Sequence, residues 1–296
     1  METPEPTIPP PKRDSHPPTT FTPPPRATDA HCHIFGPADV FPFADNRTYT
    51  PPDSGLDEFK KLQQGLGLTR AVFVQASCHG TDNSAMVDAL VRGEGKYAGV
   101  AMIDDSHTDQ ELEELHDAGV RGIRFNFVKH LGGAPDIERF WRLVARVAPM
   151  GWHVELHFDA KDLAEHSGLF ERMPVPYIID HMARVDAAAG VKQTSFQQLL
   201  LMLEGDERAW VKISGAERLT ADGQPPYDDV VPFARRLVEV APDRVLWGTD
   251  WPHPNVRHMP DDGDLADLLS AIAPEEETRY RILVQNPEVL YDFAQH

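Results

Sequence analysis

The chain has 296 residues, enough for a large apolar core in one domain or in two. It carries 28 basic and 47 acidic side chains, and its formal charge of −19 repels phosphate backbones and anionic lipid surfaces. The sequence has no run of about 18 apolar residues, and its N-terminus lacks the apolar segment of a secretory signal. We therefore expect a cytoplasmic protein without nucleic acid or membrane partners.

The N-terminal segment differs in composition from the rest of the chain. Its first 25 residues contain ten of the 27 prolines and few large apolar side chains. Such a segment cannot bury enough apolar surface to offset the entropy lost on ordering. We predict an extended or disordered arm over residues 1–25 and one folded domain over residues 26–296. The two cysteines, Cys32 and Cys78, are too few for a disulfide framework and are predicted to be reduced and buried.

From residue 26 onward, short apolar or β-branched runs alternate with longer segments of helical period. Eight runs are predicted to be strands: 27–35, 71–77, 97–103, 120–127, 153–158, 177–183, 210–215 and 244–250. Helices are predicted at 56–67, 83–93, 109–119, 137–148, 195–205, 228–241 and 264–273, with a weaker one at 161–173. Eight parallel strands with crossover helices can close a sheet without leaving an edge. The pattern predicts an α/β protein with a (β/α)8 TIM barrel, and an open doubly wound sheet is the alternative.

Polar side chains gather near the carboxyl ends of the predicted strands, where a barrel of this kind has its active site. His31 and His33 share one face of the first strand, while Cys32 takes the other. The fifth, sixth and eighth strands end with further candidates: His157, His181 and Asp250. A single buried histidine is usually a hydrogen-bonded core residue, but a convergent set of ionisable groups would be costly to satisfy structurally. We interpret the set as a reaction centre.

Three arginines, Arg124, Arg184 and Arg218, stand near the ends of the fourth, sixth and seventh strands. A structural interpretation would pair each with a nearby carboxylate of the chain. Three guanidinium groups around one opening instead favour an acidic substrate, because a protein of charge −19 needs a local positive cluster to capture a dianion.

This arrangement, with HxH on the first strand, histidines on the fifth and sixth and an aspartate on the eighth, resembles the amidohydrolase superfamily. The segments TDAHCHIFG, GVRGIRFNF, IIDHMAR and GTDWPHP are similar to the branch of 2-pyrone-4,6-dicarboxylate hydrolases and related muconolactone and sugar-lactone hydrolases. The similarity extends over essentially everything after residue 26. The resemblance implies an enzyme that hydrolyses the lactone ring of an acidic aromatic catabolite, a small anionic substrate.

The resemblance also implies roles for individual residues. Asp250 would be the general base for the attacking water, and His31, His33 and His181 would polarise the lactone carbonyl. The substrate carboxylates would be held by Tyr49, Ser77, Arg124, Arg184 and Arg218. Enzymes of this branch are understood to work without a metal.

Two positions depart from that pattern. His130 stands where the branch has a further arginine, which removes a permanently charged anchor from the substrate site. His157 stands where the branch has a tyrosine at the end of the fifth strand. With His31, His33 and Asp250, it restores the ligand set of metal-dependent members, for which zinc is the best-suited ion. One divalent metal and metal-free catalysis are therefore both open at this stage.

Other functions are compatible with the same residues. A metal-dependent decarboxylase or a sugar-acid lactonase could use this scaffold. A catalytically inactive protein whose Pro-rich arm recruits a partner is the alternative from another class. Such a protein would be expected to lose the histidine and aspartate set, which is intact here. The sequence does not determine the oligomeric state.

Overall fold

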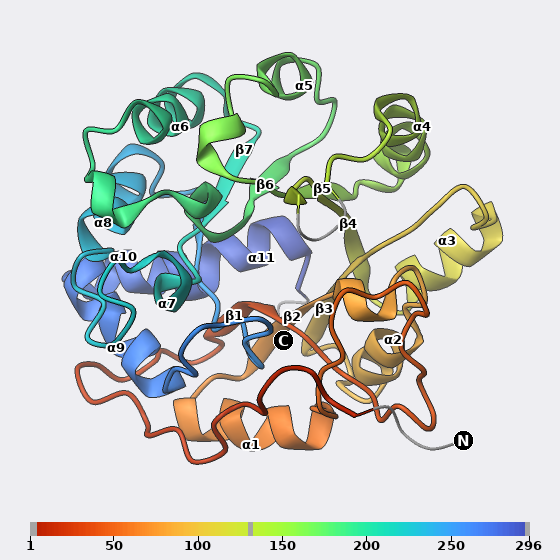
Figure 1. Cartoon of the computed structure of the whole chain (residues 1–296), viewed down its shortest axis with the longest axis horizontal. Coiled ribbons are helices and arrows are strands. Elements are labelled where there is room, and N and C mark those ends of the chain that lie inside the picture. Colours follow the sequence, from red (N-terminus) through yellow and green to blue (C-terminus); the bar gives the residue numbers. More distant parts are fainter. Residues whose placement is uncertain (1–4, 130–132, 294–296) are drawn as a thin grey trace.

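The computed structural model describes residues 5–129 and 133–293, which form one eight-stranded parallel sheet with its strands in chain order (Figure 1). The strands are β1 (Thr28–Cys32), β2 (Arg70–Val74), β3 (Tyr97–Ala101), β4 (Val120–Asn126), β5 (His153–His157), β6 (Tyr177–Ile179), β7 (Ala209–Lys212) and β8 (Val245–Leu246).

Backbone hydrogen bonds join the first strand to the segment that follows the last strand. The amide of Ala30 donates to the carbonyl of Trp247 over 2.8 Å, and the amide of Asp250 donates to the carbonyl of His31 over 2.8 Å. These bonds bring the two edges of the sheet together into a nearly closed cylinder. The predicted (β/α)8 barrel is confirmed, and the open sheet is not formed.

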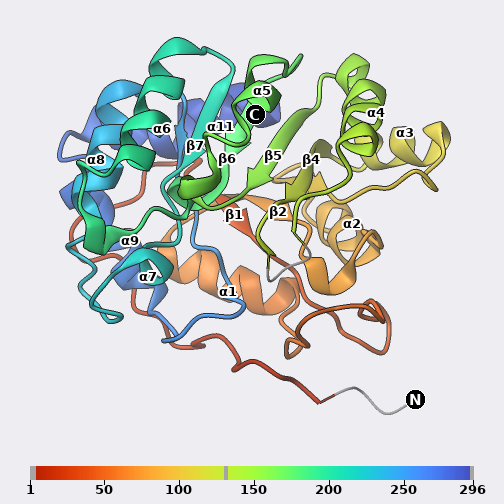
Figure 2. The same cartoon turned by 45° about the horizontal axis from the view of Figure 1, so that its top comes forward.

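Helices surround the barrel (Figures 1 and 2). They are α1 (Leu56–Leu66), α2 (Ser84–Val91), α3 (Asp109–Asp117), α4 (Ile137–Val147), α5 (Ser167–Glu171), α6 (Thr194–Gly205), α7 (Ala216–Leu219), α8 (Val231–Val240), α9 (Asp262–Ile272), α10 (Glu276–Tyr280) and α11 (Asn286–Tyr291). Helix α4 illustrates the local causes. At the start of this helix, the side chain of Asp136 accepts a hydrogen bond from the amide of Arg139. Phe140, Leu143 and Val144 form the buried stripe of the helix.

Several strands are shorter than predicted, because their carboxyl ends turn away from the sheet. Strand β6 ends at Ile179, and a 3₁₀ turn over Asp180–Arg184 follows, with a left-handed backbone at His181 (φ 49°). Strand β8 ends at Leu246, and Asp250 also has a positive φ of 66°. Side-chain alternation along a strand therefore does not apply to these two positions, and local turns aim their side chains.

Two helices near the C-terminus, α10 and α11, were not predicted. Tyr291, the last residue of α11, and Phe293 pack against the apolar side chains that fill the barrel, including those of Ala30, Val72 and Leu246. A larger apolar cluster lies between the strands and the surrounding helices. The barrel is thus closed by side chains at the end opposite to the candidate site. Cys32 and Cys78 are free and buried, as predicted.

The described part of the N-terminal arm, residues 5–25, contains no helix or strand and runs along the outside of α1 and α9 (Figure 2). Lys12 Nζ lies 2.5 Å from a carboxylate oxygen of Asp261, and Ser15 Oγ lies 3.1 Å from one of Asp262. Polar contacts at the start of α9 therefore hold the extended segment. No helix among the described residues is long and apolar enough to cross a membrane.

Candidate active site

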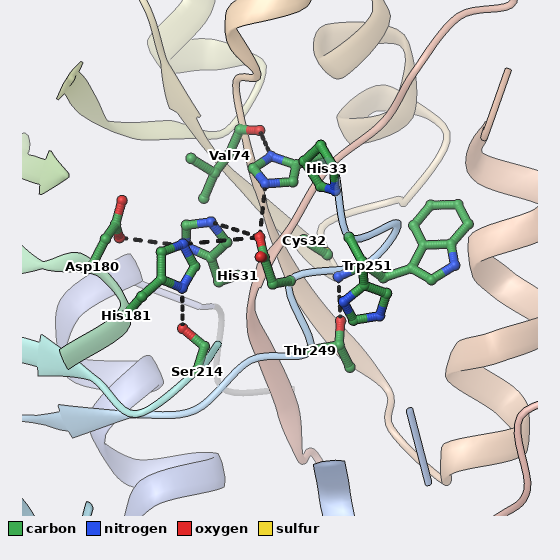
Figure 3. A network of polar contacts seen from close by, with 12 residues as sticks. His31, Cys32, His33, Val74, Asp180, His181, Ser214, Thr249 and Trp251 are labelled. Carbon is green, nitrogen blue, oxygen red and sulfur yellow. Dashed lines mark hydrogen bonds and ion pairs between the residues drawn. The ribbon is translucent and has the colours of Figure 1, made fainter. Parts of the chain in front are cut away.

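Figure 3 shows the rings of His31, His33 and His181 close to one another, and all three face the carboxylate of Asp250. The Nε2 atoms of His33, His31 and His181 lie 3.1, 3.6 and 3.9 Å from its Oδ1. The ring of His31 is 5.0 Å from that of His33 and 4.6 Å from that of His181. All four side chains are buried. Strand β1, the turn after β6 and the segment after β8 thus bring four predicted catalytic residues together.

The ring of His33 has an acceptor at each nitrogen. Its Nδ1 donates to the carbonyl oxygen of Val74 over 2.7 Å, and its Nε2 lies 3.1 Å from Oδ1 of Asp250. Because a carboxylate only accepts, the second contact requires either a proton on Nε2 or a cation between the nitrogen and the oxygen. These two contacts fix the orientation of the ring, with Nε2 directed at the carboxylate.

The other oxygen of Asp250 is held by Arg218. Both Nε and Nη2 of this guanidinium lie 2.6 Å from Oδ2. Burial by itself raises the pKa of Asp250, but the charge of Arg218, together with the nearby imidazoles, outweighs burial and holds the pKa well below its usual range. Asp250 is therefore ionised at neutral pH and able to accept a proton from water.

A buried lysine lies behind the imidazoles, and the sequence analysis did not single it out. Nζ of Lys212, on β7, lies 2.9 Å from Nδ1 of His31 and 2.5 Å from Oε2 of Glu155. The same Nδ1 also lies 3.4 Å from Oδ1 of Asp180 and 3.5 Å from Oε1 of Glu155, while Nε2 points toward the central carboxylate. The run 210–215 did contain a signal, since a lysine in an apolar strand must find an acceptor.

Burial keeps the side chains of His181 and His157 neutral. Burial lowers the pKa of His181 to about 4, while its Nδ1 contacts the hydroxyl of Ser214 at 2.9 Å. Burial, and then the charge of Arg124, holds the pKa of His157 well below its usual value. The ring of His157 lies 5.4 Å from that of His181, and neither of its nitrogens has a hydrogen-bond partner among the described residues.

Each of the three predicted arginines pairs with a carboxylate of the chain. Nη2 of Arg124 lies 2.9 Å from Oδ2 of Asp180, and Nε of Arg184 lies 2.7 Å from Oδ1 of Asp159. Arg218 holds the central carboxylate, as described above. The structural pairing considered from the sequence is therefore present, while all three guanidinium groups also line one cavity.

That cavity has a volume of about 460 Å³ and lies over the imidazoles at the carboxyl end of the barrel. Tyr49 and Ser77, two predicted substrate-binding residues, line it. Burial raises the pKa of Tyr49 well above its usual value, so the phenol stays protonated and can donate a hydrogen bond. His130 lies outside the described residues. The wall also includes Asp186, Glu217, Asn255 and Arg257.

His253, which the sequence left unassigned, is buried between two carboxylates behind this wall. Its Nε2 lies 3.0 Å from Oδ1 of Asp262, and its Nδ1 lies 3.7 Å from Oε1 of Glu217. Burial by itself lowers the pKa of His253, but the two carboxylates raise it to about 10. The ring is therefore a permanent cation at neutral pH that fixes the segment after β8.

A sequence model of the amidohydrolase family, Amidohydro_2, matches residues 28–293, and the chain belongs to this family. It is 48% identical over 279 residues to a 2-pyrone-4,6-dicarboxylate hydrolase of Comamonas testosteroni, covering 92% of each chain. It is 43% identical to a 4-sulfomuconolactone hydrolase of Rhizobium radiobacter, over 93% of this chain and 92% of that one.

Among solved structures, an amidohydrolase of Burkholderia multivorans with bound zinc has a TM-score of 0.71 and 18% identity, covering 90% of this chain and 99% of that one. At this identity the likeness concerns the fold. Within the described residues of the present chain, buried side chains could also hold a metal ion. Three groups have donor atoms that all lie within 4.8 Å of one another: His31, Asp180 and His181; His31, His33 and Asp250; and Glu217, Asp250 and His253.

Proposed function

We propose that the protein hydrolyses the lactone ring of 2-pyrone-4,6-dicarboxylate or of a closely related acidic lactone such as a muconolactone. The observation that carries this proposal is an ionised carboxylate, Asp250, which lines a cavity together with His33, His181 and several arginines and has His31 beside it. The two curated relatives act on lactones that bear acidic groups, according to their names. Lactone hydrolysis requires an activated water, a polarised carbonyl and charge stabilisation, and each has a candidate here.

Asp250 activates the water in this proposal. Arg218 binds Oδ2 and leaves Oδ1, which faces the imidazoles, to take the proton as the water oxygen bonds to the lactone carbonyl carbon. The carbonyl π electrons move to its oxygen and form the tetrahedral oxyanion. When the bond from this carbon to the ring oxygen breaks, the ring oxygen takes the proton back from Asp250. Water is thereby added across the bond, and the base is restored.

The imidazoles stabilise the oxyanion as hydrogen-bond donors. In this proposal His31 carries its proton on Nε2, the nitrogen that points toward the base, and donates it in a hydrogen bond to the carbonyl oxygen. Burial keeps His181 neutral, and its Nε2 lies on the same side of the base. Donors fixed by buried partners need no reorganisation as charge develops on the oxygen, which is how an oxyanion site lowers the barrier.

The same hydrogen bonds bear on the choice between zinc and metal-free catalysis. Nδ1 of His31 contacts Lys212 and lies near the carboxylates of Glu155 and Asp180, so a metal would bind Nε2 and displace any proton there. His157 belongs to none of the close donor groups among the described residues. His31, His33 and Asp250 lie close enough to hold a metal and would supply three ligands, the number in catalytic zinc sites. Three of the four predicted zinc ligands are thus close together and His157 stands apart from them; we propose the metal-free mechanism, with one divalent metal on His31, His33 and Asp250 as the alternative.

The test is the loss of ultraviolet absorbance when the purified full-length protein opens the ring of 2-pyrone-4,6-dicarboxylate, with 4-sulfomuconolactone assayed in parallel. We expect turnover of at least one acidic lactone, and unchanged activity after chelator treatment of protein with less than stoichiometric metal. Absence of turnover at any pH, or with any added divalent metal, would contradict the proposed reaction. Activity lost to the chelator and restored by zinc would contradict only the metal-free mechanism.

Two rival activities give distinct results in the same assays. A decarboxylase would release carbon dioxide in proportion to substrate consumed, whereas ring hydrolysis releases none. A sugar-acid lactonase would accept neutral aldonolactones, which offer no anionic group to the arginines of the cavity. Preference for the diacid lactone over a neutral lactone, with no carbon dioxide released, therefore supports the proposed function over both.

A further inference from the structure

The cavity wall contains a fourth arginine, Arg257, which was not among the predicted site residues. It lies seven positions after the base, Asp250, in the loop between β8 and α9, and its side chain is exposed. The loop forms one side of the cavity mouth together with Asn255 and Val256. Arg257 is therefore within the wall of the same cavity as the base, but at its solvent side.

Arg257 differs from the other three arginines of the cavity wall in its ion pairing. Arg124, Arg184 and Arg218 each contact a carboxylate of the chain at 2.9 Å or less. Arg257 has no ion pair with any residue in the ranges 5–129 and 133–293. Its guanidinium group is therefore the cation of the cavity wall that the described chain leaves unbalanced.

Hydrogen bonds hold the first residues of the loop that carries Arg257. Nη1 of Arg218 donates to the carbonyl oxygen of Pro254 over 2.8 Å, and the amide of His253 donates to the carbonyl of Asp250 over 2.8 Å. His253 is in turn buried between two carboxylates. A long cationic side chain on an anchored loop can reach an anion in the cavity without rearrangement of the backbone.

We propose that Arg257 binds the acidic group of the substrate that faces the cavity mouth and so determines the preference for diacid lactones. This inference rests on the proposed function and assigns one residue to its specificity. A guanidinium group without an internal partner can form a bidentate contact with a carboxylate or sulfonate without first breaking an ion pair. At a net charge of −19, a local cation at the entrance also offsets long-range repulsion of a dianion.

The experiment compares Arg257→Gln with the wild type on 2-pyrone-4,6-dicarboxylate and on the two 2-pyrone monocarboxylates that each lack one acidic group. The matched control is Arg142→Gln on the outer surface, where Arg142 pairs with Asp105. We expect KM for the diacid to rise about 10- to 100-fold in Arg257→Gln with kcat nearly unchanged, since a binding contact to a non-reacting group is lost. Arg257→Lys should recover part of the loss, and Arg142→Gln should match the wild type.

The monocarboxylates separate a contact from a structural effect. If Arg257 contacts one acidic group, Arg257→Gln should leave unchanged the KM, or the competitive Ki, of the compound that lacks this group. Equal weakening for all three compounds, or an unchanged KM for the diacid, would overturn the assignment while the lactone hydrolysis stands. A wild type that opens no pyrone ring would instead refute the proposed function, and this inference with it.

Discussion

The two ends of the barrel each contain a buried histidine outside the reaction centre, and their surroundings make one neutral and the other cationic. His153 begins β5 at the amino-terminal end, packs against Tyr291, and has no hydrogen-bond partner for either ring nitrogen among the described residues. Burial, and then the charge of Lys212, lowers the pKa of His153 to about 3. At the carboxyl end, two carboxylates raise the pKa of His253 to about 10. Burial alone therefore does not decide the charge of a histidine. Nearby carboxylates make a buried ring cationic, and a ring without them stays neutral.

The comparison explains why one end of the barrel is suited to catalysis. The carboxyl end holds paired charges whose partners are fixed by burial, so an ionised base and neutral donors exist side by side. The amino-terminal end is filled by apolar side chains and leaves its histidine neutral. Substitutions at the carboxyl end are expected to change turnover or stability, and those at the amino-terminal end stability alone. The stability contributions of His253 and His153 are expected to change with pH in opposite directions.

The largest effect on turnover is expected from a substitution of the general base, Asp250. Asp250→Asn removes the proton acceptor and retains the shape, so turnover should fall by about 10²- to 10⁴-fold. Substrate binding, measured by calorimetry, should remain measurable, because the guanidinium groups of the wall are unchanged. Turnover within threefold of the wild type would show that another group activates the water.

His253→Gln should cause the largest loss of stability. It removes the cation between Glu217 and Asp262 and leaves Arg218 beside Glu217 and the Ser15 hydroxyl beside Asp262, at a cost of about 2 to 3 kcal/mol in the free energy of unfolding. His258→Gln, at an exposed position in the same loop, is the matched control and should change stability by less than about 0.5 kcal/mol. Urea unfolding at pH 7 measures both.

The pH dependence tests the same assignment. The pKa of His253 is about 10 in the folded protein and about 6.5 when unfolded, so its contribution is complete below pH 6.5 and is lost as the pH rises through 10. The stability difference between the wild type and His253→Gln should therefore shrink from pH 7 to pH 10. A difference that stays constant over this range would show that the ring is neutral in the folded protein.

A smaller effect is expected where the arm crosses α9. A Cβ atom at Gly263 would lie 2.2 Å from the carbonyl oxygen of His16, so Gly263→Ala must displace the arm. We expect a net loss of about 1 kcal/mol in unfolding free energy, although alanine favours helix by a similar amount. The control is Gly65→Ala in α1, where a Cβ meets nothing within 4 Å and should stabilise. Equal stabilisation by both substitutions would mean that the arm contributes nothing.

The smallest effect at neutral pH is expected from His153→Leu, which replaces a neutral, unpartnered ring by an apolar side chain and should change unfolding free energy by about 1 kcal/mol or less. The folded pKa of His153, about 3, lies below the unfolded value, so the wild type loses stability as the pH falls from 6.5. The variant should lack this part of the acid sensitivity. Thermal unfolding at pH 7 and pH 5 measures the difference, and an unchanged acid sensitivity would contradict the assignment.

The sequence by itself determined the barrel, because alternating apolar and helical segments report which faces are buried, and burial drives the fold. It also selected His31, His33, His181 and Asp250, because polar residues at the ends of apolar strands are costly unless they have a use. The bounds of the long helices followed for the same reason, as with α4, where the apolar stripe and the capping aspartate agree.

Only the tertiary structure decided which charges meet. Lys212 lies 181 positions from His31, and Arg218 lies 32 positions from Asp250, and neither separation has a period that a sequence pattern can reveal. Proton positions and pKa values depend on contacts within a few ångströms and on exclusion of water, because electrostatic interactions strengthen steeply in a buried site. These properties arise only when the strands close into a barrel.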